Sequence, residues 1–334
     1  MSRITLPGRL IIALLVVALV FFGVRFFNST HPAAPAPVVA TASTSSPIAS
    51  PTADEPTTTS NSSQSPAFAY ESPAPVGGKL KGVVELGASG FNSFVVRIDQ
   101  NRNWKLENAE FGNSLVLENM ATDNDVRLGL KSYIGKMLDN GVGGRDIHFV
   151  VSSGAQLAPS TVKIMKSLKS LGYVVNTVTA EKEGILGLRS VMPPSFAGKS
   201  FVADIGSGNT KISWLAAGQP KSVESYGAKY FEKGTSDAVV AADVKGKAQQ
   251  VPAALRQTCF IIGGIPFELA KQVRKGKERY TVLNAADTYQ LNNAKGKAGV
   301  TIYQAPAEGT GCQQFVFDWD ANFTIGYLLS LPVQ

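Results

Sequence analysis

One pattern occurs twice in the chain and constrains its fold more than any other feature. Residues 82–99 read GVVELGASGFNSFVVRID, and residues 201–215 read FVADIGSGNTKISWL. Each copy is an apolar strand that ends in an acid, followed by an apolar residue, a glycine, a turn of small residues and a second strand. Glu85 and Asp204 hold the same place in the two copies, 119 residues apart. Two such hairpins predict a duplicated half-structure with a cleft between the halves.

The residue types in these turns suit a phosphate ligand. Glycines and small residues let backbone N–H groups approach an anion closely, and an acid at a strand end can hold a hydrated divalent cation. We therefore expect Glu85 and Asp204 to hold Mg²⁺, while the turns clamp a phosphate chain. The alternative is a pair of ordinary β-hairpins with glycine-rich turns. The expected phosphate contacts are Gly87, Ala88, Ser89 and Gly90 in the first turn, and Gly206, Ser207, Gly208, Asn209, Thr210 and Lys211 in the second.

Strand-like and helix-like segments alternate from Lys79 onward, which favours an α/β fold over an all-β sandwich. Short runs rich in β-branched and aromatic residues predict strands, and apolar residues at helical spacing predict helices. The expected strands cover residues 82–86, 93–98, 146–152, 173–179, 201–205, 211–216, 258–262 and 313–318. The expected helices cover residues 123–139, 159–171, 184–190, 239–248 and 266–275.

The N-terminal region has the composition of a membrane anchor. Residues 10–24 read LIIALLVVALVFFGV, close to the length that crosses a bilayer once the two phenylalanines after Arg25 are added. Arg3 and Arg9 precede this run, and no basic residue follows Arg25 until the folded region begins, so the N-terminus is expected in the cytoplasm. We predict a single-pass anchor at residues 1–27 in a bacterial inner membrane, with an extracytoplasmic or periplasmic folded domain. A cleaved signal peptide is the alternative.

The segment after this anchor is predicted to be a tether. Residues 28–78 contain nine of the chain's 18 prolines and otherwise consist mostly of Ser, Thr and Ala. Such a segment cannot bury enough apolar surface to offset the entropy lost on ordering. We expect a disordered linker over residues 28–78, a first lobe at residues 79–192 and a second lobe at residues 193–334.

The overall charge and the rare side chains limit the possible partners. A formal net charge of +7 favours an anionic ligand, such as polyphosphate or a nucleotide. Nucleic acid is not indicated, because no dense run of Lys and Arg carries interleaved aromatic residues. Cys259 and Cys312 could pair in an oxidising compartment or remain buried free thiols. A zinc site is not expected, because His31 lies in the linker and His148 stands alone in a strand.

Four stretches of the sequence resemble the exopolyphosphatase / guanosine-pentaphosphatase (Ppx/GppA) family, within the superfamily of actin, sugar kinases and chaperone ATPases. The turns after Glu85 and Asp204 are similar to the two phosphate loops of this family. Residues 178–186, VTAEKEGIL, resemble a segment whose last glutamate acts as the base on the attacking water, and Glu183 falls on that position. Residues 260–265, FIIGGI, resemble a glycine pair near the base or the distal phosphate, which assigns that role to Gly263 and Gly264.

The chain departs from the family pattern at several of these positions. Glu85 is one methylene longer than the usual aspartate, and Lys211 stands where the family has a metal-holding glutamate. A lysine there would repel Mg²⁺ but could hold phosphate. An arginine contact expected near residues 152–156 is absent, and Gly184 replaces an alanine. These departures weaken the case for catalysis more than the case for the fold.

The resemblance implies a two-lobed, actin-like fold of the duplicated ribonuclease-H-like type, with a central cleft, from about residue 82 to the C-terminus. It also implies hydrolysis of a terminal phosphate of polyphosphate or a nucleotide, with Glu183 as the base and Mg²⁺ at Glu85 and Asp204. We therefore expect a membrane-tethered phosphoanhydride-binding protein that acts as a phosphatase. The alternative is an inactive actin-like scaffold that binds a protein partner at the cell envelope, with Glu183 a solvated charge at a helix start.

Overall fold

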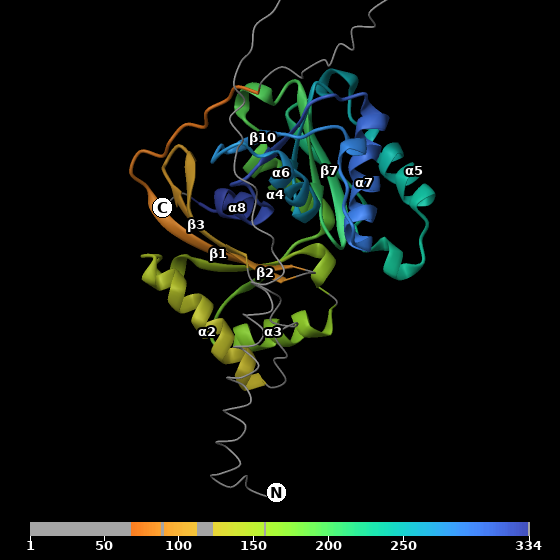
Figure 1. Cartoon of the computed structure of the whole chain (residues 1–334). Helices are drawn as coiled ribbons and strands as arrows, with labels where there is room; N and C mark the ends of the chain where they lie inside the picture. The colour runs from red at the N-terminus through yellow and green to blue at the C-terminus, as the bar shows by residue number, and fades with distance from the viewer. Residues whose placement is uncertain (1–67, 88–89, 112–122, 157, 333–334) are drawn as a thin grey trace, which may run out of the picture. The chain divides into compact units, whose positions relative to one another are not determined.

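The computed structural model describes residues 68–87, 90–111, 123–156 and 158–332. This part of the chain is an α/β structure built on two mixed β-sheets, as the alternating pattern predicted (Figure 1). The helices α2 and α3 lie against the first sheet, and α5 and α7 lie on the outer side of the second (Figure 1).

The first sheet has five strands in the order β3-β2-β1-β4-β5. The strands β1, β2 and β3 form an antiparallel meander, and β4 and β5 continue the sheet in parallel with β1. Its strands are β1 (Lys79–Gly87), β2 (Gly90–Ile98), β3 (Trp104–Phe111), β4 (Ile147–Val151) and β5 (Val175–Thr177).

The second sheet has six strands in the order β10-β11-β9-β6-β7-β8. The strands β6, β7 and β8 form an antiparallel meander, and β9 and β11 run parallel to β6. Its strands are β6 (Ser200–Ile205), β7 (Asn209–Ala216), β8 (Gln219–Tyr226), β9 (Thr258–Ile262), β10 (Tyr280–Val282) and β11 (Phe315–Asp318).

The two sheets repeat one arrangement of strands. The order β3-β2-β1-β4-β5 in the first sheet corresponds to β8-β7-β6-β9-β11 in the second, and β10 is an added edge strand. The strands β1 and β6, which carry the two acids of the repeated motif, hold the same central place. The duplication predicted from the paired hairpins is therefore present in the fold.

Seven α-helices with assigned bounds cover the sheets in the described part of the chain. Outer helices pack apolar stripes against the sheets: Leu130 and Ile134 of α2 belong to the core of the first sheet, and Val240 and Val244 of α5 belong to that of the second. The helices are α2 (Asp123–Asp139), α3 (Pro159–Ser170), α4 (Ala180–Val191), α5 (Asp237–Ala248), α6 (Gly264–Val273), α7 (Ala294–Thr310) and α8 (Phe323–Ser330).

The inner helices α4 and α8 lie on the opposite faces of the sheets. Leu188 and Val191 of α4 pack with the second sheet, and Ile325 of α8 packs with the first. The two helices also contact each other, because a Cβ atom at Gly326 would overlap the carbonyl oxygen of Leu186. The predicted lobe boundary between residues 192 and 193 falls just after α4.

Residues 68–78, which the sequence placed in the linker, make defined contacts with the folded part. The ring of Phe68 lies 5.3 Å from that of Tyr280 on β10 and 5.6 Å from that of Phe260 on β9. Further along, the backbone N–H of Val76 donates to Asp99, which follows β2. We call residues 68–76 the strap, because they contact both sheets.

The expected membrane span at residues 10–24 lies outside the described residues. Within the described part, no helix combines the length and the apolar character needed to cross a bilayer. The anchor and the remaining linker, residues 28–67, stay predictions from the sequence.

Candidate functional site

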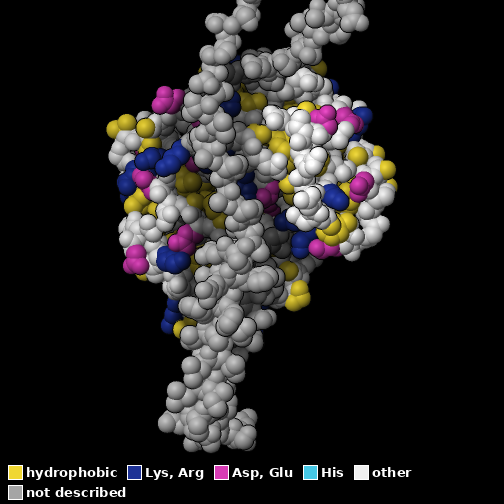
Figure 2. Space-filling model, viewed as in Figure 1, with side chains coloured by type: hydrophobic (Ala, Val, Ile, Leu, Met, Phe, Trp, Pro, Cys, Tyr) yellow, Lys and Arg dark blue, Asp and Glu magenta, His cyan; other side chains and the backbone are white. Residues whose placement is uncertain are grey.

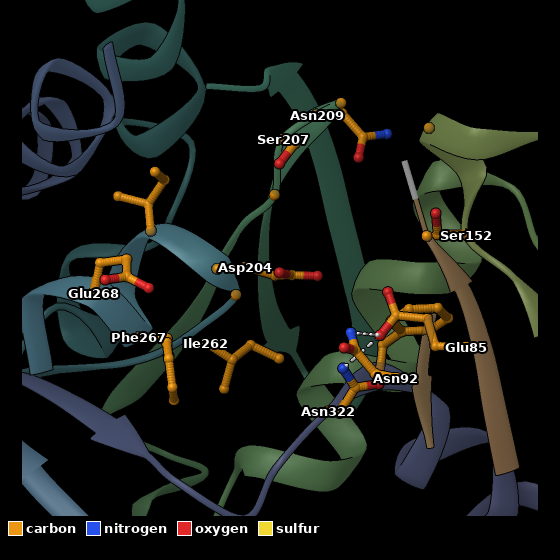
Figure 3. A pocket seen from close by; sticks show the side chains of 18 of the residues that line it. Glu85, Asn92, Ser152, Asp204, Ser207, Asn209, Ile262, Phe267, Glu268 and Asn322 are labelled. Atoms are coloured by element: carbon orange, nitrogen blue, oxygen red, sulfur yellow. Dashed lines mark hydrogen bonds between the residues drawn. The ribbon is translucent and has the colours of Figure 1, made fainter. Parts of the chain in front are cut away.

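A cavity of about 510 Å³ is lined by residues of both sheets and of the helices α4 and α6. Asp204 points into it from the end of β6, toward the side on which Glu85 lies (Figure 3). The cavity thus brings together most of the residues that the sequence singled out. Those on its wall are Glu85, Gly87, Glu183, Asp204, Gly206, Ser207, Gly208, Asn209, Lys211, Gly263 and Gly264.

The remaining predicted site residues have other positions. Ala88 and Ser89 lie outside the described residues. Gly90 begins β2 and pairs with Gly87 across the first hairpin. Thr210 is fully buried, and strand alternation turns it to the face of Ile212, away from the cavity, so a phosphate contact through its hydroxyl does not fit.

The alternation of β1 and β6 explains why both acids face the cavity. The residues on either side of Glu85 pack into the outer core of the first sheet, and those on either side of Asp204 pack into the outer core of the second. Because side chains alternate along a strand, Glu85 and Asp204 point to the inner faces. Each acid stands near the end of its strand, where the glycine turn begins.

Glu85 is held by two amide groups from different parts of the chain. Asn92 of β2 and Asn322 before α8 each donate to Glu85 Oε2 at 3.0 Å (Figure 3). Burial raises the pKa of Glu85 to about 7; the two amide donors oppose this shift, and the charges of Glu183 and Asp204 add to it. Glu85 therefore changes charge near neutral pH.

Glu183 sits in the first turn of α4 and is 3 % exposed. Thr179 caps this helix by accepting a hydrogen bond from the Lys182 N–H, which fixes the position of Glu183. The backbone N–H and the hydroxyl of Ser153 donate to Glu183 Oε2 at 2.7 and 2.6 Å, and the Lys211 ammonium donates to Oε1. Both oxygens of the predicted base are thus already engaged, and the alternative of a solvated charge does not fit.

Lys211 lies at the centre of the acidic residues. Its Nζ is ion-paired with Glu183 and lies 3.6 Å from Asp204 Oδ2, and its side chain is 3 % exposed. Asp204 and Lys211 are direct cross-strand neighbours in the β6–β7 hairpin, so the pair follows from the register. Burial would lower the pKa of Lys211, but the carboxylates of Asp204 and Glu183 outweigh it and raise the pKa. Burial also raises the pKa of Asp204, although Lys211 opposes this.

The predicted Mg²⁺ site between Glu85 and Asp204 does not fit this arrangement. A divalent cation needs carboxylate oxygens that are free to bind it, but an ammonium group already lies between Asp204 and Glu183. Within the described residues no group of three or more His, Cys, Asp or Glu side chains is placed to hold a metal ion. Lys211 lies on the cavity wall, but its ammonium group is paired with the acids, so the predicted phosphate contact would compete with these ion pairs.

The glycine turns come close to one another and to the acids. A Cβ atom at Gly154, in the short turn after β4, would lie 3.2 Å from the Cα of Gly208 in the second hairpin. Gly263 has φ +106°, and a Cβ there would lie 2.9 Å from Asp204 Oδ1. Gly263 requires glycine, because its backbone conformation and the atoms opposite it exclude a side chain, and at Gly154 a side chain would be a tight fit. Backbone from the second hairpin and the start of α6 can therefore approach a ligand directly.

A chain of hydrogen bonds runs beside these turns. Asn209 donates through Nδ2 to the Ser153 hydroxyl at 2.8 Å and to Glu224 Oε1 at 2.6 Å. Ser153 in turn donates to Glu183, so the second hairpin is tied to the loop after β4 and to α4. The amide of Asn209 is therefore used in holding the site together.

Several residues of the site were not among those predicted from the sequence. Asn92, Ser153 and Asn322 hold the predicted acids, and Glu268 and Lys295 lie on the cavity wall. Ser153 belongs to the stretch in which a phosphate contact was sought, so its position was partly indicated. The others are isolated polar residues, and only the fold reveals their role.

Charged groups are mixed over the surface as well as in the cavity. On the face shown in Figure 2, Lys and Arg side chains of the described residues are interspersed with Asp and Glu. Lys295, on the cavity wall, has a pKa lowered by burial and by the nearby charge of Lys229. Cys259 and Cys312, for which a disulfide or free thiols were both open, are buried free thiols in the structure.

Comparison with known proteins gives the fold. No family model and no curated protein matches the sequence. Among solved structures, the Aquifex aeolicus member of the Ppx/GppA family is 16 % identical, with a TM-score of 0.57 over 75 % of this chain and 97 % of that one. An exopolyphosphatase from Cytophaga hutchinsonii is 12 % identical, with a TM-score of 0.59 over 76 % and 99 %. An exopolyphosphatase-like protein is 13 % identical, with a TM-score of 0.58 over 75 % and 97 %.

The chain has their fold. The α/β, actin-like architecture expected from the paired motifs is thus confirmed for the described part. Identities this low carry no residue roles from one protein to another, and a fold can serve many functions. The function must therefore be argued from the cavity itself.

Proposed function

We propose that this chain is a membrane-tethered phosphoanhydride-binding protein that hydrolyses the terminal phosphate of polyphosphate or a nucleotide. The observation that carries the proposal is the convergence of the glycine-rich second hairpin, the start of α6 and three carboxylates on one cavity. Backbone N–H groups at a glycine turn and at a helix start are suited to phosphate oxygens. Solved structures with the same fold include an exopolyphosphatase.

In the proposed reaction, water attacks the terminal phosphorus and the bridging oxygen leaves with the shortened chain. Glu183 Oε1, which accepts from Lys211, has a second lone pair through which it can orient the water and accept its proton. The anchor and linker predicted from the sequence would put this reaction outside the cytoplasm, at the inner membrane. Nucleoside triphosphates are scarce there, which favours polyphosphate as the ligand.

A second candidate function is binding without turnover, as an inactive actin-like protein that holds a ligand or a partner. The engagement of both Glu183 oxygens by Ser153 and Lys211 favours it. The two candidates share the cavity and differ in whether Glu183 can act on water.

The deciding experiment measures phosphate release and ligand binding by the full-length protein with polyphosphate, ATP and guanosine pentaphosphate. The hydrolase predicts release by the wild type, loss of release in Glu183→Gln and unchanged binding. Glu181→Gln is the matched control, because Glu181 is exposed on the same turn of α4 and should leave release unchanged. If the wild type binds the ligand but releases no phosphate, the second candidate is supported. If it neither binds the ligand nor releases phosphate, the proposed function is wrong.

A further inference from the structure

The ammonium of Lys211 lies between two of the carboxylates that would have to hold a divalent cation in this cavity. It donates to Glu183 Oε1, lies 3.6 Å from Asp204 Oδ2, and contributes a positive charge that Glu85 also senses. Lys211 and Glu183 are both 3 % exposed, so water screens their interaction poorly. The carboxylates that would attract a metal ion are therefore already paired with a positive charge of the protein itself.

The surrounding structure fixes Lys211 in this place. The β6–β7 register sets it opposite Asp204, and the capped start of α4 brings Glu183 to its other side. A Cβ atom at Gly184 would overlap the hydroxyls of Ser213 and Ser222, which shows how tightly α4 is seated on β7 and β8. Moving the ammonium out would leave buried carboxylates without a partner.

Two of the carboxylate oxygens that remain already accept hydrogen bonds. Glu183 Oε2 accepts two hydrogen bonds from Ser153. Glu85 Oε2 accepts from Asn92 and Asn322. A doubly charged ion would also meet the fixed positive charge of Lys211 at close range.

We infer that Lys211 is a built-in cation that replaces the divalent ion at this site. The cavity accordingly takes its phosphate ligand without Mg²⁺; this part of the inference rests on the proposed function. The first part, that the wild-type cavity does not bind a divalent ion and that removal of the lysine charge creates such a site, does not depend on any phosphate ligand.

The test measures Mn²⁺ binding to the full-length protein by electron paramagnetic resonance, with Mn²⁺ as the probe for Mg²⁺ sites. We expect no specific site in the wild type and at least about a tenfold gain in affinity in Lys211→Glu, because a carboxylate replaces a repelling charge. Lys221→Glu makes the same charge change at an exposed position on β8 and should gain nothing. The unfolding temperature of Lys211→Glu should rise with Mn²⁺, whereas that of the wild type should not.

Measurements on the wild type alone can overturn the inference, so the test remains decisive even if Lys211→Glu fails to fold. Micromolar Mn²⁺ binding by the wild type that Asp204→Asn abolishes would show that the ion and Lys211 coexist. Polyphosphate binding by the wild type that EDTA removes would also refute the inference. If polyphosphate binds neither with nor without EDTA, the proposed function fails, and the Mn²⁺ measurement still decides whether Lys211 excludes the ion.

Discussion

Glu85, Asp204, Glu183 and Lys211 lie close together, and their neighbours' charges shift the pKa values of Glu85, Asp204 and Lys211. Burial raises the pKa of Glu85 to about 7, and the acids around Lys211 raise the pKa of its ammonium group. Lys211 thus stays charged at neutral pH, whereas Glu85 titrates there. The stability of the protein should report both effects.

The first residue-scale prediction concerns pH. Because the pKa of Glu85 rises from 4.5 to about 7 on folding, the folded state binds the proton more tightly than the unfolded chain. The contribution of Glu85 to stability is complete below pH 4.5 and is lost as pH rises through 7. Since the side chain is partly open to the cavity, we expect a loss of about 1–2 kcal/mol. Urea unfolding at several pH values measures it.

The control for this prediction is Glu85→Gln, which keeps the size of the side chain and removes the titration. The difference in free energy of unfolding between wild type and variant isolates Glu85, because the other ionisable groups are common to both. A difference that stays constant between pH 4.5 and 8 would contradict the assigned shift.

The second residue-scale prediction concerns the buried ion pair. Lys211→Met keeps the length of the side chain but leaves Glu183 and Asp204 without their cation, so we expect a loss of about 3–5 kcal/mol in the free energy of unfolding. Lys221→Met on the exposed strand β8 should change stability by no more than about 0.5 kcal/mol. Chemical denaturation of both variants checks this. Equal losses of stability would show that the ion pairs of Lys211 contribute no more than an exposed lysine.

At the scale of elements, α4 links the site to the rest of the fold. Its first turn carries Glu183, its N-cap is Thr179, and its body lies between α8 and the second sheet. A small displacement of this helix would move Glu183 relative to Lys211 and Ser153. The glycine that follows Glu183 is the point where such a displacement would begin.

We therefore expect Gly184→Ala to destabilise the protein by about 1–3 kcal/mol, because the added methyl group overlaps Ser213 and Ser222 and forces α4 outward. The matched control is Gly135→Ala in α2, where no atom lies within 4 Å of the added Cβ. That change should stabilise the protein by about 0.5–1 kcal/mol, since alanine favours a helix. Thermal unfolding compares the two variants. Equal changes in their stability would contradict the close packing of α4 on β7 and β8.

Most elements of the two sheets could be predicted from the sequence, because strand runs such as residues 258–262 and the helix at residues 123–139 have clear periodicity. The strands β3, β8 and β10 and the helices α7 and α8 were not predicted. Gly296, Gly299 and Pro306 lower the helix propensity of α7, yet its packing on the second sheet outweighs this. In β8, charged and polar residues hide the strand pattern.

The site was predictable where it belongs to a repeated motif and not elsewhere. The hairpins revealed Glu85 and Asp204, but the role of Asn322 depends on α8 approaching β1 from 237 residues away. The Asp204–Lys211 pair could have been deduced from the hairpin register, since both residues are at matching distances from the turn. What the sequence could not provide is how Glu183 meets that pair.

At the scale of the whole described part, the strap contacts both sheets. Ser72 Oγ and the Tyr280 hydroxyl lie 2.8 Å apart on the second sheet, and the Val76 N–H donates to Asp99 beside the first. Phe68 and Tyr70 add aromatic contacts with Phe196. Residues assigned by composition to a tether therefore contribute to the stability of the folded part.

We expect Phe68→Ala to lower the free energy of unfolding by about 2–3 kcal/mol, because the ring packs with three aromatic side chains and is only partly exposed. Val76→Ala is the control within the same strap, since Val76 is 87 % exposed and should change stability by less than about 0.5 kcal/mol. Denaturant unfolding measures both variants. An unchanged free energy of unfolding in Phe68→Ala would show that the strap does not stabilise the folded part.

Gly154 and Gly208 face each other on the cavity wall with no side chain between them, and the Ser153–Asn209 hydrogen bond lies beside them. Two backbones in contact leave no passage at that rim. The proposed phosphate ligand would therefore have to enter the cavity at a point away from this contact.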